Sequence, residues 1–184
     1  MNRPRRIAVI STTCGCGKTT LGEALADRLG ARFIELDALV QGPGWTETPD
    51  DALRATLLPL LAEPAWVVDG NYRNKLGDFV VSRADVVVWL DLPVWVWLPR
   101  LIRRSLVRAV RREVLWNGNR ESLKGALWGR DSLVAYALRH AGPRRAAWPT
   151  ELARYPVVRL TSTRQVDRFL RGVLGHGRPQ RGGL

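Results

Sequence analysis

Cysteine is scarce in this chain of 184 residues, and its placement excludes two classes of small protein. The two cysteines, Cys14 and Cys16, lie two positions apart, so they cannot cross-link distant segments and do not complete a zinc site by themselves. Long uncharged apolar runs are also missing, since the tryptophan-rich stretch at residues 86–98 carries Asp91 and Pro93. A membrane-spanning helix needs about 18 uncharged residues or more, so we expect no integral membrane protein.

The N-terminal segment lacks the features of a secretion signal. Residues 1–6 are basic, but the apolar run at residues 7–10 is too short for such a signal and no small-residue cleavage site follows it. We therefore expect a cytoplasmic protein.

Lysine is rare and arginine is abundant. Of the 29 basic residues only Lys18, Lys75 and Lys124 are lysines, and with 17 acidic residues the net charge is +12. Arginine richness can reflect genome composition, but residues 100–145 alone carry 11 arginines and one lysine against three acidic residues, a surplus of nine positive charges. A concentrated basic field attracts phosphate groups, whether of nucleotides or of nucleic acid.

Five short apolar segments predict the strands of a parallel sheet. Their apolar residues are continuous, as is typical of strands buried on both faces, and helical segments separate them. The fold class is therefore predicted as α/β, a five-stranded parallel sheet with helices on both faces. The expected strands are residues 7–10, 32–36, 65–68, 85–90 and 157–160.

Capping residues indicate where two of the helices begin. Thr48 and Pro49 are expected to cap and open a helix that runs to Leu61. Ser162 and Gln165 form a candidate capping pair for the last helix.

A glycine-rich turn directly after the first predicted strand matches a phosphate-binding loop. Residues 12–19, TTCGCGKT, fit the P-loop pattern GxxxxGK[ST], except that Thr12 occupies the first glycine position. The backbone N–H groups of such a loop and the following helix N-terminus would hold a polyphosphate. Lys18 would reach the β- and γ-phosphates, and Thr19 would ligate Mg²⁺. The predicted ATP-binding residues here are Thr13, Cys14, Gly15, Cys16, Gly17, Lys18, Thr19 and Thr20.

Three aspartates each follow a predicted strand, at the edge where open α/β sheets bind ligands. The alternative for each is a helix cap or a turn residue. Asp37 is a candidate to accept a proton from an acceptor hydroxyl or to hold Mg²⁺ through water. Asp69 is the other candidate for the metal, and for Asp91 the structural role and the functional role weigh equally.

The chain resembles the adenylate-kinase-related group commonly labelled DNA topology modulation proteins, from about residue 5 to residue 171. This resemblance implies a P-loop NTPase fold like that of nucleoside monophosphate kinases, with a helical lid. Residues 1–174 are then expected to form a single domain, with a lid and helical insert at about residues 111–145 and a disordered tail at residues 175–184. Besides the P-loop, the resemblance depends on LDAL at 36–39, PGW at 43–45, VVDGNYR at 67–73, WLDLP at 89–93 and WNGNRES at 116–122.

The resemblance also implies an acceptor site. DGNYR is similar to the DGFPR signature of adenylate kinases, whose Asp serves the magnesium shell and whose Arg contacts the acceptor phosphate, so Asp69 and Arg73 would take these roles. Asn71 and Tyr72 replace the Phe and Pro of that signature, which weakens the case for an AMP-type acceptor. Trp45 follows a Gly-Pro-Gly turn and would stack on a base or sugar of the acceptor, or else pack under its loop.

Four arginines receive roles from the same resemblance. Arg100 would lie against the nucleotide base, and Arg104 would approach the phosphates. Arg112 and Arg120 would approach the phosphates from the lid and act in catalysis together with Lys18 and Asp37. The alternative for each arginine is an exposed helix face.

The predicted function is an ATP-dependent, Mg²⁺-requiring phosphotransferase that moves the γ-phosphoryl group to a nucleotide, a nucleoside or a related small acceptor. One alternative acceptor is a non-nucleotide alcohol such as a sugar acid or an antibiotic. The other alternative is a nucleotide-regulated protein that binds nucleic acid and affects DNA topology. We expect a monomer or a homodimer without a membrane partner.

Overall fold

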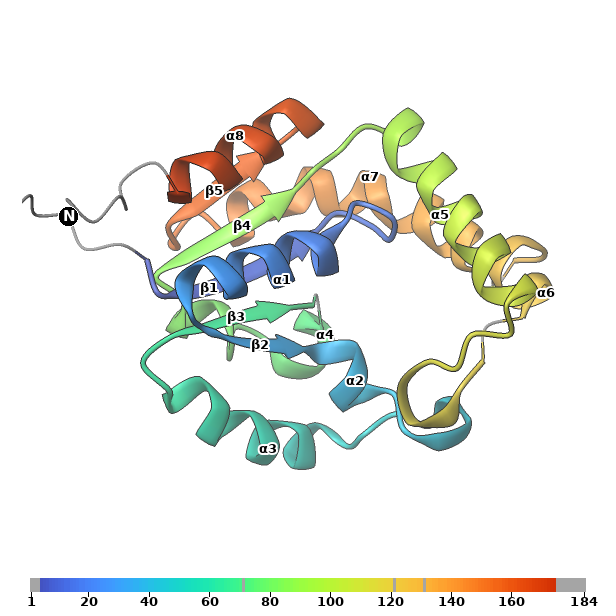
Figure 1. Ribbon diagram of the computed structural model, residues 1–184, viewed down its shortest axis with the longest axis horizontal. Helices are drawn as coiled ribbons and strands as arrows, with labels where there is room; N and C mark the ends of the chain where they lie inside the picture. The colour runs from blue at the N-terminus through green and yellow to red at the C-terminus, as the bar shows by residue number, and fades with distance from the viewer. Residues whose placement is uncertain (1–3, 71, 121, 131, 175–184) are drawn as a thin grey trace, which may run out of the picture.

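The fold is built on one sheet with the strand order β2-β3-β1-β4-β5, in which every neighbouring pair is parallel (Figure 1). The computed structural model describes residues 4–70, 72–120, 122–130 and 132–174, so the predicted disordered tail lies outside the described residues. The prediction of a five-stranded parallel α/β sheet is confirmed. The strands are β1 (Arg6–Ser11), β2 (Arg32–Glu35), β3 (Trp66–Asp69), β4 (Val86–Leu90) and β5 (Val157–Leu160).

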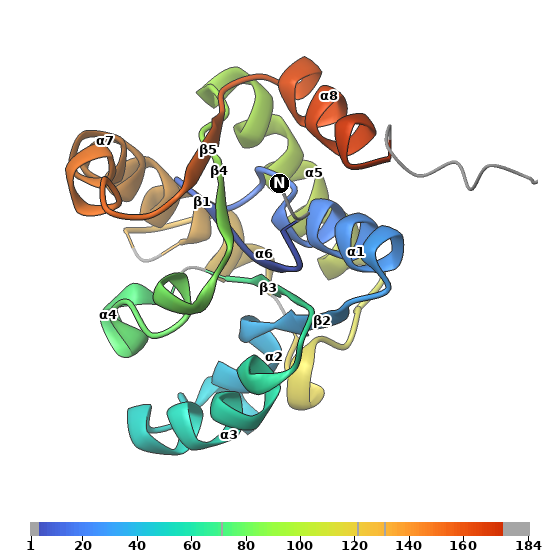
Figure 2. The ribbon, with the colours of Figure 1, turned by 90° about the vertical axis from the view of Figure 1, so that its left-hand side faces the viewer.

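Helices cover both faces of the sheet (Figure 2). The α-helices are α1 (Lys18–Leu29), α2 (Leu36–Val40), α3 (Asp50–Ala62), α4 (Arg73–Leu76), α5 (Val94–Val110), α6 (Leu123–Leu127), α7 (Leu133–Glu151) and α8 (Thr163–Leu174). Short 3-10 turns occur at η1 (Pro43–Trp45), η2 (Val81–Arg83) and η3 (Trp116–Gly118). Among the described residues, none of the helices is both long enough and apolar enough to cross a membrane.

Successive strand residues point alternately into two separate apolar cores, which explains why the strand segments are continuously apolar. In β1, Ile7 and Val9 point into the core that α1, α5 and α8 cover. Ala8 and Ile10 point into the opposite core, which α3, α4 and the C-terminal part of α7 cover. Because β1 is central, its carboxyl end is flanked by the ends of β3 and β4, and Val9 pairs in register with Asp69.

One short helix was not predicted, and one helix cap was predicted wrongly. The helix α2 follows β2 directly, so Leu36, expected to end the strand, and Asp37 both lie in the first turn of a short helix. The helix α3 has Pro49 at its N-cap position, whereas the Thr48 hydroxyl donates to the Leu39 carbonyl at 2.7 Å and caps nothing. At α8 the Ser162 hydroxyl accepts from the Gln165 N–H at 3.3 Å, as a cap does.

Candidate active site

The P-loop joins β1 to α1 and has the geometry expected of a phosphate-binding turn. Gly15 and Gly17 adopt φ values of 80° and 84°, the left-handed region that side chains with a Cβ rarely enter. A Cβ on Gly15 would lie 2.6 Å from the Trp97 carbonyl oxygen, so α5 packs directly on the loop. The absence of a side chain at residue 15 is therefore required both by the backbone angle and by the neighbouring helix.

The remaining loop residues differ in their exposure. Cys14 is half-buried and Cys16 is buried, and burial raises the pKa of the Cys16 thiol although the Thr13 backbone and Lys18 act in the opposite direction. The Thr13 hydroxyl is buried and has no hydrogen-bond partner among the described residues. Thr20 is exposed in the first turn of α1, where a bound phosphate could reach it.

Lys18, Thr19 and Asp69 meet at the carboxyl ends of β1 and β3. The Thr19 hydroxyl donates to Asp69 Oδ2 at 2.6 Å, and Lys18 Nζ lies 3.9 Å from Asp69 Oδ1. Burial raises the pKa of Asp69, opposed by Lys18 and by the Thr19 hydrogen bond. Burial would lower the pKa of Lys18, but the nearby negative groups, Asp69 first, raise it overall.

The Thr19 and Asp69 pair fits a magnesium ion. Asp69 Oδ1 is buried and has no hydrogen-bond partner among the described residues, which leaves one carboxylate oxygen for a cation or its water. The residues described contain no cluster of three or more His, Cys, Asp or Glu side chains that could hold a metal without help. Mg²⁺ does not need such a cluster, because it is held by one or two protein oxygens, several waters and the phosphates of its substrate.

Asp37 and Tyr72 form a hydrogen-bonded pair, and Asp37 is close enough to Lys18 to help raise its pKa. The Tyr72 hydroxyl donates to Asp37 Oδ1 at 2.5 Å and accepts from Gln41 Nε2 at 3.2 Å. Burial and the Asp37 carboxylate together raise the pKa of Tyr72, which keeps the phenol protonated as a donor. Asp37 is thus oriented by a side chain that the sequence prediction placed in the same site, while Asn71 lies outside the described residues.

Arg73 is engaged within the protein. Its two terminal nitrogens lie 2.8 Å from Asp78 and 2.6 Å from Glu151. Contact with an acceptor phosphate would require these ion pairs to open, so this role of Arg73 stays a prediction.

Of the arginines assigned to ATP and the lid, Arg100 and Arg104 lie on α5, Arg112 follows its end, and Arg120 bridges to Val114. Arg104 follows Leu101 by three residues on α5, and Leu101 packs against Gly15, so Arg104 lies on the helix face next to the P-loop. The Arg104 Nε is buried without a hydrogen-bond partner among the described residues. The side chains of Arg100, Arg112 and Arg120 are exposed, and their contacts with ATP stay predictions.

Two loops that are far apart in the sequence are joined to each other. The acceptor-side loop (residues 41–47) and the lid loop (residues 114–120) are each closed at the base by an antiparallel bridge. Asn119 is buried; its Nδ2 donates to the Gly42 carbonyl at 2.8 Å, and its Oδ1 accepts from the Trp45 N–H at 3.0 Å. Asn117 Nδ2 donates to the Gln41 carbonyl at 2.6 Å. The lid loop is therefore docked by direct hydrogen bonds onto the loop that precedes α3.

The aromatic residues of these loops have different roles. The Trp45 side chain is 44% exposed, which leaves part of the ring open to a ligand, and its stacking on an acceptor stays a prediction. The Trp116 Nε1 donates to Glu35 Oε2 at 2.8 Å. Glu35 was not predicted as a site residue, although it is an acidic residue at the end of a strand, like Asp69. Burial raises the pKa of Glu35, and Asp37 and Asp69 add to this effect.

Comparison with known proteins gives matches among P-loop kinases. A protein-family model described as shikimate kinase matches residues 14–43. Shikimate kinase 2 of Escherichia fergusonii is 32% identical over 102 residues, which is 47% of this chain and 55% of that protein. The chain thus spans about half the length of this curated relative.

Solved structures share the fold over most of its length. The shikimate kinase of Acinetobacter baumannii in complex with shikimate is 20% identical, with 92% of this chain and 90% of that chain covered and a TM-score of 0.57. A gluconokinase of Sinorhizobium meliloti 1021 is 22% identical, with 95% and 92% covered and a TM-score of 0.53. A shikimate kinase of Bacteroides thetaiotaomicron gives a TM-score of 0.55 at 17% identity, with 94% and 98% covered.

The sequence matches to shikimate kinase agree with the predictions of a small-molecule kinase, of ATP and of Mg²⁺. The solved structures show the fold alone. None of these matches confirms the resemblance to DNA topology modulation proteins or a nucleotide as acceptor.

Proposed function

We propose that the protein is an ATP-dependent, Mg²⁺-requiring kinase that phosphorylates a hydroxyl group of a small alcohol. The observation that carries this proposal is the arrangement of Lys18, Thr19 and Asp69 at the P-loop, with the Asp37 carboxylate on the acceptor side. The matches to shikimate kinase support the same chemistry.

The donor side acts through position and charge. The backbone N–H groups of the P-loop and the N-terminus of α1 would bind the phosphates, and Lys18 would neutralise the charge that spreads over the transferred phosphoryl group. Thr19 and Asp69 would hold Mg²⁺. When bound, the metal neutralises phosphate charge and helps to hold the β- and γ-oxygens in position. Arg104, Arg112 and Arg120 are proposed to add permanent positive charge when the lid closes.

The acceptor side would position a hydroxyl and take its proton. Asp37 is the proposed base, and the hydrogen bond from Tyr72 fixes the orientation of its carboxylate. An alcohol is favoured over a nucleoside monophosphate, because Arg73 is held by Asp78 and Glu151. Shikimate and gluconate, the compounds after which the similar kinases are named, are hydroxylated carboxylic acids, so we propose an acceptor of this class.

An acceptor screen tests this function. ATP and Mg²⁺ are combined with shikimate, gluconate, other sugar acids, nucleosides and nucleoside monophosphates, and ADP release is measured together with the ³¹P spectrum of the product. We expect a phosphate ester of a hydroxy acid, formed by the wild type but not by Lys18→Ala. Transfer to a nucleoside monophosphate, or no transfer to any alcohol, would contradict the proposed acceptor class. Binding of duplex DNA that weakens steeply with salt would instead favour the nucleic-acid alternative.

A further inference from the structure

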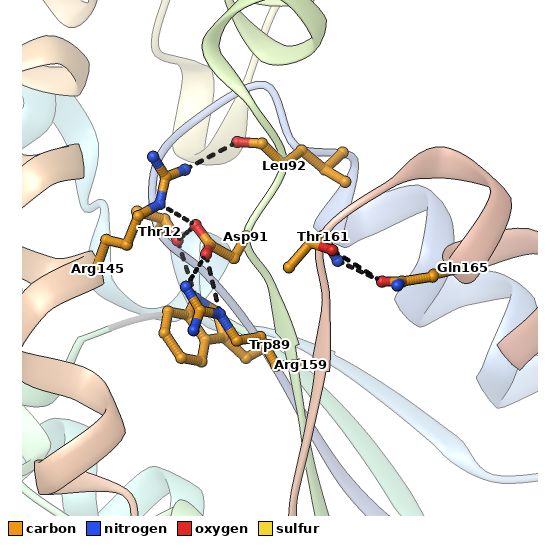
Figure 3. A network of polar contacts seen from close by, with 8 residues as sticks. All are labelled: Thr12, Trp89, Asp91, Leu92, Arg145, Arg159, Thr161 and Gln165. Atoms are coloured by element: carbon orange, nitrogen blue, oxygen red, sulfur yellow. Dashed lines mark hydrogen bonds and ion pairs between the residues drawn. The ribbon is translucent and has the colours of Figure 1, made fainter.

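Thr12 occupies the first glycine position of the P-loop pattern. Its side chain is completely buried and makes two hydrogen bonds. Its hydroxyl donates to Asp91 Oδ1 at 2.8 Å and accepts from Trp89 Nε1 at 2.9 Å (Figure 3). A glycine could make neither bond. The departure from the pattern therefore adds a specific connection between the P-loop and the end of β4.

Asp91 connects two other elements of the fold, α7 and β5, to this residue. Its carboxylate is 2% exposed, yet two arginines reach it from different elements. Arg145 of α7 donates from Nε to Oδ1 at 2.7 Å, and Arg159 of β5 donates from Nε to Oδ2 at 3.0 Å (Figure 3). A buried carboxylate whose two oxygens both accept charge-assisted hydrogen bonds is held in one orientation.

A second residue of α7, Arg144, contacts the P-loop directly. Arg144, the neighbour of Arg145, donates from Nη1 to the Thr12 carbonyl at 3.3 Å and from Nη2 to the Tyr136 hydroxyl at 2.7 Å. Both the backbone oxygen and the side chain of Thr12 are thus linked to α7, directly or through Asp91. The lid loop (residues 114–120) and α6 precede α7 in the chain, so the helix that follows them contacts the first residue of the phosphate loop.

Contacts to the Trp89 ring add to this arrangement. The Trp89 ring packs edge-on against Trp148 of α7 with 5.4 Å between the ring centres, and the Arg159 guanidinium lies 4.3 Å from the Trp89 ring centre. The indole that donates to Thr12 is therefore in contact with both α7 and β5. A polar network whose members are all satisfied and packed in this way favours one conformation.

We propose that Thr12 and Asp91 are positioning residues, which together with Arg145 hold the P-loop in the conformation that binds triphosphate and couple it to α7. This inference rests on the proposed function, because it assumes that the P-loop binds ATP. None of the three residues needs to touch the nucleotide.

Substitutions at Thr12 separate this role from a general effect on folding. Thr12→Val keeps the branched shape and removes the hydroxyl, whereas Thr12→Ser keeps the hydroxyl. We expect Thr12→Val to weaken the calorimetric affinity for MgATP about tenfold, as loss of a hydrogen bond to a charged group does, and Thr12→Ser to bind close to the wild type. In the ligand-free protein, hydrogen exchange in residues 12–17 should accelerate in Thr12→Val and remain slow in Thr12→Ser.

Asp85 provides a matched control at the other end of β4. Its carboxylate accepts the backbone N–H groups of Arg5 and Arg6 at 2.8 and 2.9 Å, far from the P-loop. Asp91→Asn should weaken MgATP binding and accelerate exchange in the P-loop, while Asp85→Asn should lower thermal stability with both quantities unchanged. Equal effects of the two variants, or a Thr12→Val protein that matches the wild type, would overturn the positioning role. Failure of the wild type itself to bind MgATP would defeat the proposed function, and exchange in residues 12–17 would still decide whether the network orders the loop.

Discussion

Asn119 offers a direct way to test whether the lid loop is held by the acceptor-side loop. It is 4% exposed although it lies in a loop, and its amide makes two hydrogen bonds, to the Gly42 carbonyl and from the Trp45 N–H. Replacing Asn119 by Ala removes both bonds at once. It leaves the apolar cores intact, because Asn119 belongs to neither of them.

The size of the effect follows from these two bonds. Each neutral hydrogen bond contributes about 0.5–1.5 kcal/mol net, so the docked state would lose about 1–3 kcal/mol. Since 1.4 kcal/mol corresponds to a factor of ten, opening of the lid loop should become about 5- to 150-fold more frequent. The hydrogen bond of Asn117 to the Gln41 carbonyl remains, so docking is weakened and not abolished.

Hydrogen exchange and steady-state kinetics measure this opening. In Asn119→Ala, exchange in residues 42–46 should accelerate by the factor above and the acceptor KM should rise, while the midpoint of thermal unfolding changes little. Asn74→Ala, the same substitution at an exposed position of α4, is the control. Unchanged exchange in residues 42–46 would refute the docking of the two loops.

Further predictions concern catalysis, packing and pH. Asp37→Asn should reduce kcat about 10²- to 10⁴-fold and leave calorimetric MgATP affinity nearly unchanged; a full kcat would exclude Asp37 as the base. Trp148→Ala should lower the free energy of unfolding in urea by about 3–5 kcal/mol, because its ring is 5% exposed, whereas Trp128→Ala, with a ring 81% exposed, should have little effect; equal losses would contradict the packing. Burial would raise the pKa of Asp91, but its hydrogen bonds from arginine and from Thr12 lower it overall. Its contribution to stability is therefore complete above its unfolded pKa of about 4 and lost as the pH falls through the lower folded value. In urea unfolding between pH 2 and pH 7, the free energy of unfolding should fall less steeply with acid in Asp91→Asn than in the wild type. An unchanged slope would contradict a lowered pKa of Asp91 in the folded protein.

The strand prediction succeeded because the signal is local and strong. Strands buried on both faces need continuous apolar residues, and each such segment coincides with a strand to within one residue at either end. The short α2 was missed because its five residues contain too few turns for a helical period to appear. The cap of α3 was misassigned because Thr48 satisfies a loop carbonyl, a choice that depends on where Leu39 lies in space.

The candidate site was predictable only where its residues are contiguous or follow strands. The P-loop is one segment, and Asp37 and Asp69 could be inferred from the ends of two strands. The hydrogen bonds of Thr12 could not, because its partners Trp89 and Asp91 lie 77 and 79 positions away and Arg145 belongs to α7. The docking of Asn119 on residues 42–45 likewise depends on a contact across more than 70 positions. Such pairs leave no periodic or spacing signal in a single sequence.

Calorimetric titration of MgATP into the wild type and Lys18→Ala tests the central claim, that the turn between β1 and α1 holds a triphosphate. We expect saturable binding of one MgATP per chain to the wild type, binding that is weakened by orders of magnitude in Lys18→Ala, and equal thermal stability of the two proteins without ligand. Absence of binding to a folded wild type, or equal affinity in the two proteins, would contradict the assignment of the P-loop as the nucleotide site.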